Sequence, residues 1–339
     1  MTRIGLVLGA GGIAGFGYHS GVLSALSRVT GWDPRTAGVI VGTSAGAVFA
    51  AILRGGVRAD DVLAHLLAAP SNPETMARLR TLSGRDQRGP SWLWLGPAAP
   101  RLAVSELMRP WRLRPGVFSA ALLPSGRIPT RVLGDRARAL HGRAWPDATL
   151  WVCAVRLDDG TRVVFGTDGG DVDTGTAVEA SCAIPAFFRP VVVDGVAHID
   201  GAVHSPTNAD LLAGLDLDLA VIVSPMSSTC STAARSLNPL DRMRSSRLLA
   251  REVDQVESHG TPVLVVQPDR NEVATMGPVP MDPTRLVPTT LHASSATLER
   301  LTARGLAAQL DILRQAAETQ VSPADVPYPG GPMMRGRGR

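Results

Sequence analysis

Two short apolar runs, each followed by a glycine-rich turn and a helical pattern, constrain the fold of this chain most strongly. Residues 4–8 are continuously apolar and lead into a glycine-rich stretch at 9–17, and apolar residues at helical spacing follow over 15–28. A second run at 39–41 precedes a predicted helix at 45–53. Uninterrupted apolar strands are buried on both faces, as in parallel sheets. This alternation predicts an α/β fold with a parallel sheet.

The rest of the chain continues the same pattern. Further strands are predicted at 150–155, 162–165, 191–193, 197–199, 217–223 and 263–266, and further helices at 174–182, 239–258 and 294–317. Asp173 or Thr174 is expected to cap the helix at 174–182. Residues 71–146 differ in composition, because they are rich in proline and tryptophan and contain 13 arginines against 4 acidic residues. We predict a basic, helical, cap-like insertion there.

The basic residues of the chain exclude two classes of protein. All 34 of them are arginine. A Walker A loop needs a lysine on the phosphates, so a standard P-loop NTPase is excluded. An enzyme that forms a Schiff base, including one that uses pyridoxal phosphate, needs a lysine amine and is excluded as well.

The cysteines and the hydrophobic segments bear on the location of the protein. Cys153, Cys182 and Cys230 form no C-x-x-C pair, so neither a disulfide framework nor a zinc site is predicted. The apolar run after Met1 is short and is followed by several glycines, which fits a buried first strand better than a signal peptide. No apolar stretch reaches the roughly 18 residues that a transmembrane helix needs. We expect a cytoplasmic protein.

Residues 42–46 (G-T-S-A-G) match the nucleophile pattern G-x-S-x-G. The pattern lies between a predicted strand and a predicted helix, which is the context that it requires. Such a sharp turn strains the backbone of Ser44 and exposes its hydroxyl, while Gly42 and Gly46 let strand and helix approach closely. The positive end of the helix favours a developing oxyanion. We predict that Ser44 is a nucleophile, and a capping serine in a tight turn is the structural alternative.

The glycine-rich stretch at 9–17 allows two interpretations. As a dinucleotide fingerprint it would hold a pyrophosphate at a helix N-terminus. That fingerprint needs an acidic residue about 20 positions on, at the end of the second strand, and this strand ends in residues 42–44 (G-T-S). As an oxyanion hole, its backbone N–H groups would lie beside Ser44, because adjacent parallel strands end at the same edge of a sheet. The sequence favours the oxyanion hole.

A nucleophilic serine needs a base, and the sequence offers two kinds. An α/β-hydrolase would supply a histidine such as His259 or His292, but Ser44 follows only the second strand, which argues against that fold. The alternative is a carboxylate, and Asp200, which precedes Gly201 at a predicted strand end, is the best candidate. Burial would raise its pKa towards useful base strength. The chain contains several other Asp-Gly turns, so residues alone do not choose among them.

These motifs occur together in an order that resembles the patatin-like phospholipase family. The glycine loop comes first, the serine turn at 42–46 second, and residues 200–202 (D-G-A) third. Residues 180–188 resemble that family's segment upstream of its Asp-Gly turn, and residues 206–208 (P-T-N) are similar to the segment that follows it. The likeness covers about residues 4–212, and the number and order of these motifs make it specific.

The resemblance implies both a fold and a site. The fold is a three-layer α/β/α domain with a mainly parallel central sheet. The site is a dyad with Ser44 as nucleophile and Asp200 as proton acceptor, with an oxyanion hole built from the amides of Gly11 and Gly12. The other positions that match the motifs are Gly15, Gly42, Gly46, Gly201 and Ala202. The family's activity is hydrolysis of lipid acyl esters, with no metal or organic cofactor.

Two positions depart from the family's loop, which commonly reads G-G-G-x-R/K-G. Ala10 stands at the first glycine, and Ala14 stands at the basic position. The exchange at Ala10 leaves the expected donors Gly11 and Gly12 in place. The missing cation at Ala14 concerns substrate preference or turnover and does not remove the dyad.

Residues 71–146 are expected to set specificity. Their tryptophans stand among leucines and arginines, namely Trp92, Trp94, Trp111, Leu93, Leu95, Leu113, Arg101, Arg109, Arg112 and Arg114. Tryptophan with arginine suits the interface of water and anionic lipid, while a small helical cap with buried tryptophans explains the same composition. Nucleic-acid binding is not expected, because no recognised module accompanies the basic residues. His198 and His204 flank Asp200 and are expected to be structural.

We expect one domain. Residues 4–212 form its catalytic region, residues 213–318 complete it with strands and helices, and residues 319–339 form a disordered tail. The predicted activity is cleavage of fatty-acyl esters of (phospho)lipids through an acyl-enzyme intermediate. An acyltransferase that uses the same intermediate, and a lipid- or dinucleotide-binding protein without turnover, are the alternatives. Peripheral contact with an anionic membrane is expected through residues 71–146.

Overall fold

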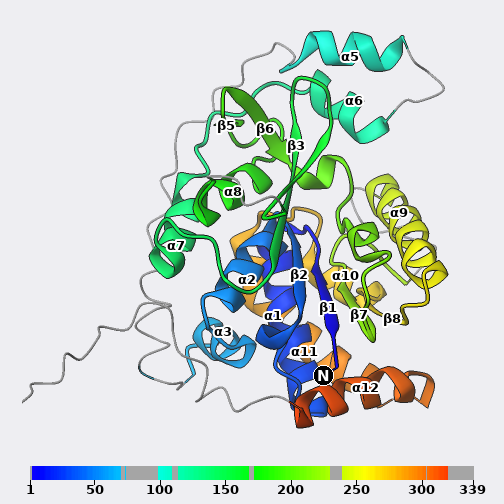
Figure 1. Cartoon of the computed structure of the whole chain (residues 1–339). Helices are drawn as coiled ribbons and strands as arrows, with labels where there is room; N and C mark the ends of the chain where they lie inside the picture. Colours follow the sequence, from blue (N-terminus) through cyan, green and yellow to red (C-terminus); the bar gives the residue numbers. More distant parts are fainter. Residues whose placement is uncertain are drawn as a thin grey trace, which may run out of the picture.

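The computed structural model of the chain describes residues 2–69, 73, 98–108, 114–167, 172–229, 239–302 and 304–319. Its strands form one eight-stranded sheet in the order β5-β6-β3-β2-β1-β7-β8, with β4 paired to β3 (Figure 1). They are β1 (Ile4–Leu8), β2 (Val39–Thr43), β3 (Leu150–Arg156), β4 (Arg162–Phe165), β5 (Val191–Val193), β6 (Val196–Asp200), β7 (Leu219–Val223) and β8 (Val263–Val266).

Helices connect and cover these strands. They are α1 (Gly12–Thr30), α2 (Ala45–Arg54), α3 (Ala59–Leu66), α5 (Pro100–Leu107), α6 (Pro115–Leu122), α7 (Arg131–His141), α8 (Thr174–Ser181), α9 (Pro239–Ser258), α10 (Arg270–Met276), α11 (Leu286–Leu301) and α12 (Ala307–Glu318). Short 3-10 turns are η1 (Pro34–Thr36), η3 (Gly201–Val203), η4 (Ala209–Leu212), η5 (Pro283–Arg285) and η6 (Arg304–Leu306).

The sheet is mainly parallel, as predicted. Strands β3, β2, β1, β7 and β8 run parallel to one another. Strands β4, β5 and β6 are antiparallel to their partners at one edge of the sheet. Because parallel strands all end at the same edge, the turns that follow β2, β1 and β7 lie next to one another in that order.

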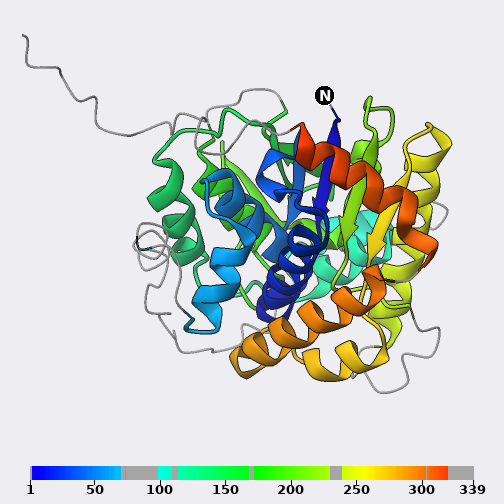
Figure 2. The ribbon, with the colours of Figure 1, turned by 90° about the horizontal axis from the view of Figure 1, so that it is seen from below.

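The core has two parts, one on each face of the sheet. In β1, Leu6 and Leu8 pack into the larger cluster with side chains from α1, α2, α8 and α11, while Val7 packs into the smaller cluster on the opposite face with side chains from α9 and η4. Figure 2 shows α1 and α9 as separate layers. This alternation of side chains along a strand buried on both sides produces the expected three layers.

Two predicted helices differ from the observed ones. The first helix begins at Gly12 and not at residue 15, so the glycine loop is short and most of residues 9–17 are helical. The single helix predicted at 294–317 is wrong, because α11 and α12 are separated by η6, in which Gly305 weakens the helical path. Helix α10 was not predicted, although Asp269 and Glu272 form a capping box at its start.

The helices of residues 71–146 belong to two environments. Helix α7 packs beside α8, where Arg138 forms ion pairs with Asp173 and Glu179. Helices α5 and α6 pack together in a small cluster of their own, and Ala120 of α6 also packs against Val155 and Ile199 of the sheet edge. Of the helices described in this segment, only α5 and α6 therefore lie over the sheet edge like a cap, at the top of Figure 1.

Part of this prediction lies outside the described residues. Several residues named in the prediction are not described, namely Trp92, Leu93, Trp94, Leu95, Arg109, Trp111, Arg112 and Leu113. Cys230 and residues 320–339 of the predicted tail also lie outside the described residues. Within the described segments, every helix is too short or too polar to cross a lipid bilayer.

Candidate active site

Ser44 occupies the turn between β2 and α2. Its backbone has a φ of 55°, which is the left-handed region that non-glycine residues rarely adopt. A Cβ on Gly46 would lie 1.9 Å from the carbonyl oxygen of Leu8, and one on Gly42 would lie 2.6 Å from the Cα of Ala47. Both neighbours are backbone atoms that cannot move aside. The strained turn predicted from the motif is present, and glycine is required on both sides of it.

The hydroxyl of Ser44 is less exposed than the motif suggested. The residue is only 3% exposed. Figure 1 shows why, because α8 and the segment after it lie above the end of β2. The turn therefore presents the serine to the interior of a site and not to bulk solvent.

Strand register brings Asp200 to the serine turn. Thr43, at the end of β2, pairs with Cys153 of β3, and Asp200, at the end of β6, pairs with the next residue, Ala154. The two strand ends thus meet at one level on either side of β3. The Ser44 side chain is close enough to the Asp200 carboxylate to lower its pKa.

Asp200 is held in a buried, hydrogen-bonded position. It is 3% exposed, and its Oδ1 accepts a hydrogen bond of 2.8 Å from the amide of Ala202. Burial raises the pKa of Asp200 to about 6, while the hydrogen bonds from Ser44 and Ala202 oppose that rise. A Cβ on Gly201 would lie 2.4 Å from the carbonyl oxygen of Cys153. The Asp-Gly turn therefore fits only because its second residue lacks a side chain.

The two distant histidines have other partners. His259 is exposed, and its Nδ1 lies 2.8 Å from the carbonyl oxygen of Gln255. His292 Nδ1 lies 2.7 Å from the hydroxyl of Thr275. Of the candidate bases, the carboxylate of Asp200 lies beside Ser44, while these two histidines have partners elsewhere.

The C-terminal end of α8 and the residues after it contact both Ser44 and Asp200. The Oγ of Ser181 accepts a 2.9 Å hydrogen bond from the amide of Ser44, and the thiol of Cys182 lies near enough to the Ser44 side chain for the hydroxyl to lower its pKa. Next along the chain, the carbonyl of Ala183 accepts a 3.0 Å hydrogen bond from the amide of Asp200. Burial raises the pKa of Cys182 well above its ordinary value, so the thiol stays neutral.

Sequence reasoning missed these contacts of Ser181 and Cys182. Residues 180–188 were recognised as similar to a family segment, but the similarity did not indicate which side chains reach the serine. The spacing of Cys182 in the sequence indicates no role at the serine, and the residue is buried. A contact between residues so far apart in sequence can be found only from the packed structure.

The glycine loop leaves two amides without a protein acceptor. Gly9 donates to Val223 (3.0 Å) and Ala10 donates to Pro206 (2.8 Å). Among the residues that the structure describes, the amides of Gly11 and Gly12 make no such bond. They stand at the N-terminus of α1, where unsatisfied N–H groups and the helix dipole favour negative charge. This arrangement suits the predicted oxyanion hole.

A buried histidine holds the start of this loop. His19 is completely buried on α1, and its Nε2 donates a 2.7 Å hydrogen bond to the carbonyl oxygen of Gly9. Burial lowers the pKa of His19 to about 4. The imidazole is therefore neutral at physiological pH, and its role is to support the loop.

Asn208 ties the segment after the Asp-Gly turn to the end of β2. Its Nδ2 donates to the hydroxyl of Thr43 (3.1 Å) and to the carbonyl of Ser205 (2.7 Å), and its backbone φ is 54°. The buried carboxylate of Glu252, on α9, accepts from the hydroxyl of Thr207 and from the amide of Ala209. These bonds hold the segment around Asn208 in place, and through it the side chain of Thr43, the residue before Ser44.

Of the two histidines that flank Asp200, His198 contacts the surrounding structure. The Nδ1 of His198 lies 2.9 Å from the carbonyl oxygen of Val196, and the imidazole ring packs against Phe165. These contacts direct His198 away from the Ser44–Asp200 pair. Burial lowers the pKa of His204. In the part of the chain that the structure describes, no three His, Cys, Asp or Glu side chains come together as a metal site would need.

Comparison with known proteins agrees with this architecture. The model of the patatin-like phospholipase family matches residues 6–213, which is more than half of the chain. The protein belongs to the patatin-like phospholipase family. Membership of this family supports lipid hydrolysis as the general class of activity. A search of curated proteins finds no match.

Similar solved structures are distant in sequence. VipD from Legionella pneumophila is 16% identical, with 88% of this chain and 67% of that chain covered and a TM-score of 0.39. The type III effector protein ExoU is 18% identical over 89% of this chain and 54% of that chain, with a TM-score of 0.32. ExoU in complex with SpcU, from Pseudomonas aeruginosa, is 18% identical over 89% and 52%, with a TM-score of 0.30. The chain thus spans about half the length of ExoU.

Proposed function

We propose that this protein is a serine acyl hydrolase that cleaves fatty-acyl esters of (phospho)lipids, with Ser44 as nucleophile and Asp200 as general base. The observation that carries the proposal is the strand register that brings the buried Asp200 carboxylate, at the end of β6, to the serine turn at the end of β2, where Ser44 lowers the pKa of Asp200. A carboxylate whose pKa lies near 6 is a stronger base than an ordinary aspartate and is still ionised at neutral pH.

The reaction follows from the arrangement of these groups. Asp200 accepts the proton of Ser44 Oγ while this oxygen bonds to the ester carbonyl carbon. The negative charge that forms on the carbonyl oxygen is stabilised by the amides of Gly11 and Gly12, at about 3–4 kcal/mol for each donor. Cleavage of the ester C–O bond releases the alcohol, which takes the proton from Asp200. Water then attacks the acyl-enzyme, with Asp200 again as base, and the fatty acid is released.

A fluorophosphonate tests the activated serine. We expect one adduct on the wild-type protein by intact mass, none on Ser44→Ala, and labelling slowed by at least about 10³-fold on Asp200→Asn. The exposed serine Ser258 supplies the control, because Ser258→Ala should be labelled like the wild type. Absence of an adduct on folded wild-type protein would refute the dyad. Offering an alcohol acceptor together with water then separates a hydrolase from an acyltransferase.

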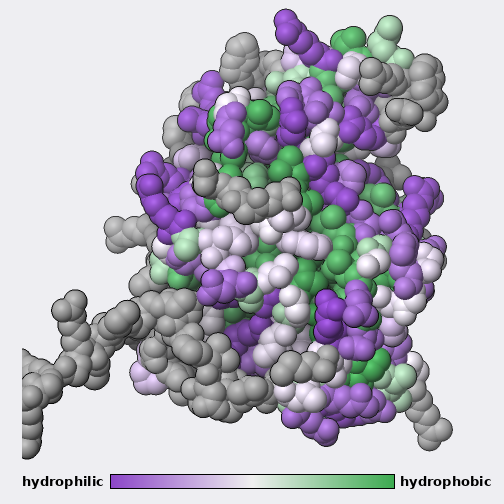
Figure 3. Space-filling model, in the orientation of Figure 1, coloured by the Kyte–Doolittle hydropathy of each residue, from purple (hydrophilic) through white to green (hydrophobic). Residues whose placement is uncertain are grey.

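We infer that the surface of α5 and α6 contacts the lipid phase. Three apolar side chains at the C-terminal end of α5 are largely exposed. Val104 is 59% exposed, Leu107 is 65% exposed, and Met108, which follows the last residue of the helix, is 72% exposed. Further exposed apolar residues of this surface are Leu122, Leu123 and Phe187, and exposed arginines beside them are Arg101, Arg127 and Arg189. Figure 3 shows hydrophobic side chains beside strongly hydrophilic ones at the top of the molecule, where α5 lies. Apolar residues ringed by arginine suit an anionic membrane.

A further inference from the structure

Residues 205–209 contact both turns on which the proposed dyad lies. The amide of Ser205 donates a 3.2 Å hydrogen bond to the carbonyl oxygen of Gly201, in the Asp-Gly turn. Further along the segment, the side-chain amide of Asn208 donates a 3.1 Å hydrogen bond to the hydroxyl of Thr43, which precedes the nucleophile. One short segment thus joins the turn of the base to the turn of the serine.

The same segment contacts the glycine loop. The carbonyl oxygen of Pro206 accepts a 2.8 Å hydrogen bond from the amide of Ala10. A Cβ on Gly9 would lie 3.2 Å from this carbonyl oxygen and 3.2 Å from the Cγ2 of Thr207, so the loop and the segment are closely packed. The amides that suit an oxyanion hole follow directly in this loop. A displacement of residues 205–209 would therefore move them relative to the serine.

One buried carboxylate of α9 holds this segment. Glu252 is 7% exposed, and its Oε2 accepts hydrogen bonds from the hydroxyl of Thr207 and, at 2.9 Å, from the amide of Ala209. Burial raises the pKa of Glu252, while these bonds oppose the rise. A buried carboxylate is unfavourable unless donors satisfy its oxygens. Here both donors belong to residues 205–209, so the buried charge is placed where it holds that segment against α9.

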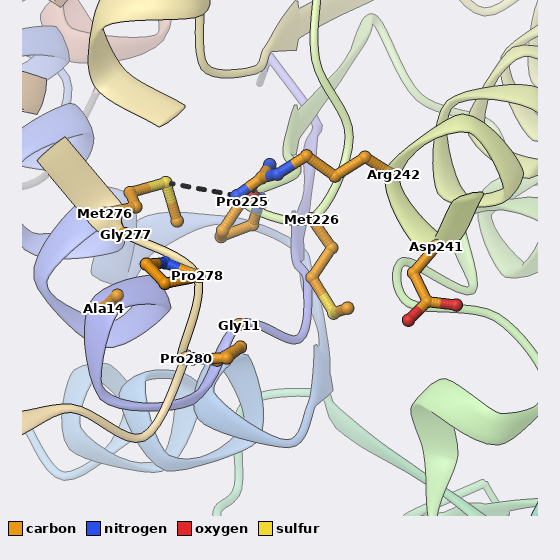
Figure 4. Close-up of a pocket in the computed structure, with 10 residues that line it drawn as sticks. All are labelled: Gly11, Ala14, Pro225, Met226, Asp241, Arg242, Met276, Gly277, Pro278 and Pro280. Carbon is orange, nitrogen blue, oxygen red and sulfur yellow. Dashed lines mark hydrogen bonds between the residues drawn. The ribbon is translucent and has the colours of Figure 1, made fainter. Parts of the chain in front are cut away.

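Helix α9 also supports a second neighbour of the glycine loop. Arg242 donates to the carbonyl oxygens of Pro225 and Ser227, at 3.0 Å each. Figure 4 shows Arg242 and Pro225 at the small pocket that Gly11 and Ala14 also line. A Cβ on Gly11 would lie 2.9 Å from the Cβ of Pro225. The glycine loop is thus in contact with two segments that one helix holds.

We propose that Glu252 is a positioning residue, which holds residues 205–209 so that the turn of Ser44 and the glycine loop keep one relative placement. The proposal rests on the proposed function, because it concerns the same nucleophile and the same oxyanion hole. Acyl transfer needs its groups placed to within about 1 Å, and a misplacement caused by a distant substitution can lower the rate by about 100-fold. Glu252 acts in this way without touching the substrate.

Two substitutions of nearly the same size test this role. Glu252→Met removes both acceptor oxygens, whereas Glu252→Gln keeps a carbonyl oxygen that can accept the same two hydrogen bonds. With p-nitrophenyl butyrate, we expect Glu252→Met to lower kcat per folded molecule by about 10- to 100-fold, while KM changes by less than about twofold. Glu252→Gln should keep kcat within about threefold of the wild type. Circular dichroism at the assay temperature measures the folded fraction.

Glu257 supplies the control, because it is exposed on the same helix. Glu257→Met removes the same charge and should leave kcat unchanged. A normal kcat in folded Glu252→Met would overturn the proposal and leave Glu252 as a support of stability alone. Equal losses in Glu252→Met and Glu252→Gln would overturn it as well, since the effect would then come from the charge and not from the hydrogen bonds.

A double substitution tests whether Glu252 acts through the segment. Asn208→Ala breaks the bond to Thr43 directly, while Glu252→Met disturbs the same bond from a distance. The loss of kcat in the double variant should therefore be smaller than the product of the two single losses, by at least about threefold. A loss equal to the product would show that the two residues act independently, which contradicts a route through residues 205–209.

Fluorophosphonate labelling separates a failure of this proposal from a failure of the proposed function. If the wild type is not labelled at Ser44, the proposed function itself fails. If the wild type is labelled and folded Glu252→Met is labelled at the same rate, only the role of Glu252 is contradicted. Should Glu252→Met not fold, Thr207→Val removes one of the two donors at constant size, and kcat should fall by about 3- to 10-fold. An unchanged kcat in Thr207→Val would then overturn the proposal.

Discussion

The surroundings of Ser44 and the surface of α5 and α6 are built on opposite principles. Ser44 and Asp200 are each 3% exposed, and each has hydrogen-bonding partners from other segments of the chain. On α5, Leu107 and Met108 are 65% and 72% exposed and leave much of their apolar area in water. One region has its interactions completed within the protein, and the other does not.

The difference indicates that the two regions have separate tasks, namely acyl transfer at Ser44 and lipid contact at α5 and α6. A site for acyl transfer needs groups held in fixed positions, and burial with complete hydrogen bonding provides this. A surface that meets lipid needs apolar area that is free in the absence of lipid. Changes near Ser44 should therefore affect every ester substrate, while changes on α5 should affect only substrates presented in a membrane.

Gly46→Ala should have the largest effect on stability. The added Cβ would meet the carbonyl oxygen of Leu8 at 1.9 Å, so strand and helix must separate, and we expect a loss of at least about 3 kcal/mol in the free energy of unfolding. Urea denaturation measures this. Gly305→Ala is the matched control, because nothing lies within 4 Å of its Cβ position. Similar stabilities of the two variants would contradict the close approach.

Asp200→Asn should change how stability depends on pH. Burial raises the pKa of Asp200 from 3.8 to about 6, so the folded state favours the protonated carboxyl. This contribution is complete below pH 4 and is lost as the pH rises through 6. The variant should therefore be more stable than the wild type above pH 6, by up to about 3 kcal/mol, and the gap should close towards pH 4.

Thermal melting of both proteins between pH 4 and pH 8 checks this. A gap that does not vary with pH would mean that Asp200 has the same pKa in the folded and unfolded states. The wild-type rate on a soluble ester should rise with pH through about 6, since only the ionised carboxylate of Asp200 can accept the proton from Ser44.

Asn208→Ala should have an intermediate effect. It removes the donor to Thr43 and Ser205 and places alanine at a φ of 54°, so we expect a loss of about 1–3 kcal/mol in stability. Because Thr43 precedes the nucleophile, kcat on a soluble ester should also fall while KM changes little. Asn271→Ala, at an exposed position of α10, is the control. A normal kcat would show that the bond to Thr43 does not position Ser44.

The smallest effect on the folded protein is expected on α5. Leu107→Gln combined with Met108→Gln should change the free energy of unfolding by less than about 0.5 kcal/mol, because both side chains are exposed. Binding to anionic vesicles should weaken by about tenfold or more, since each apolar side chain loses its burial in lipid. Co-sedimentation measures the binding, and a soluble ester should be cleaved at the normal rate. Unchanged vesicle binding would refute lipid contact through α5.

Local patterns in the sequence were sufficient for most of the elements. The strands at β4 and β8 and the helix α9 have the predicted boundaries, and Asp173 caps α8 as expected. These features depend on neighbours a few residues apart, whose spacing and turn chemistry are visible in the chain itself. The break between α11 and α12 was missed because a single glycine inside a helical pattern is tolerated in many helices.

Sequence alone thus determined the class of fold, the serine turn and the short list of candidate bases. The residues alone left several Asp-Gly turns open and the family resemblance pointed to Asp200, while the tertiary structure brings this turn to Ser44 through the register of β6 against β3. It also decided that Ser181 and Cys182 lie at the serine, and that Arg242 of α9 reaches the pocket at Ala14. Each of these contacts joins segments far apart in the chain, and their meeting is set by strand pairing and packing rather than by any local pattern.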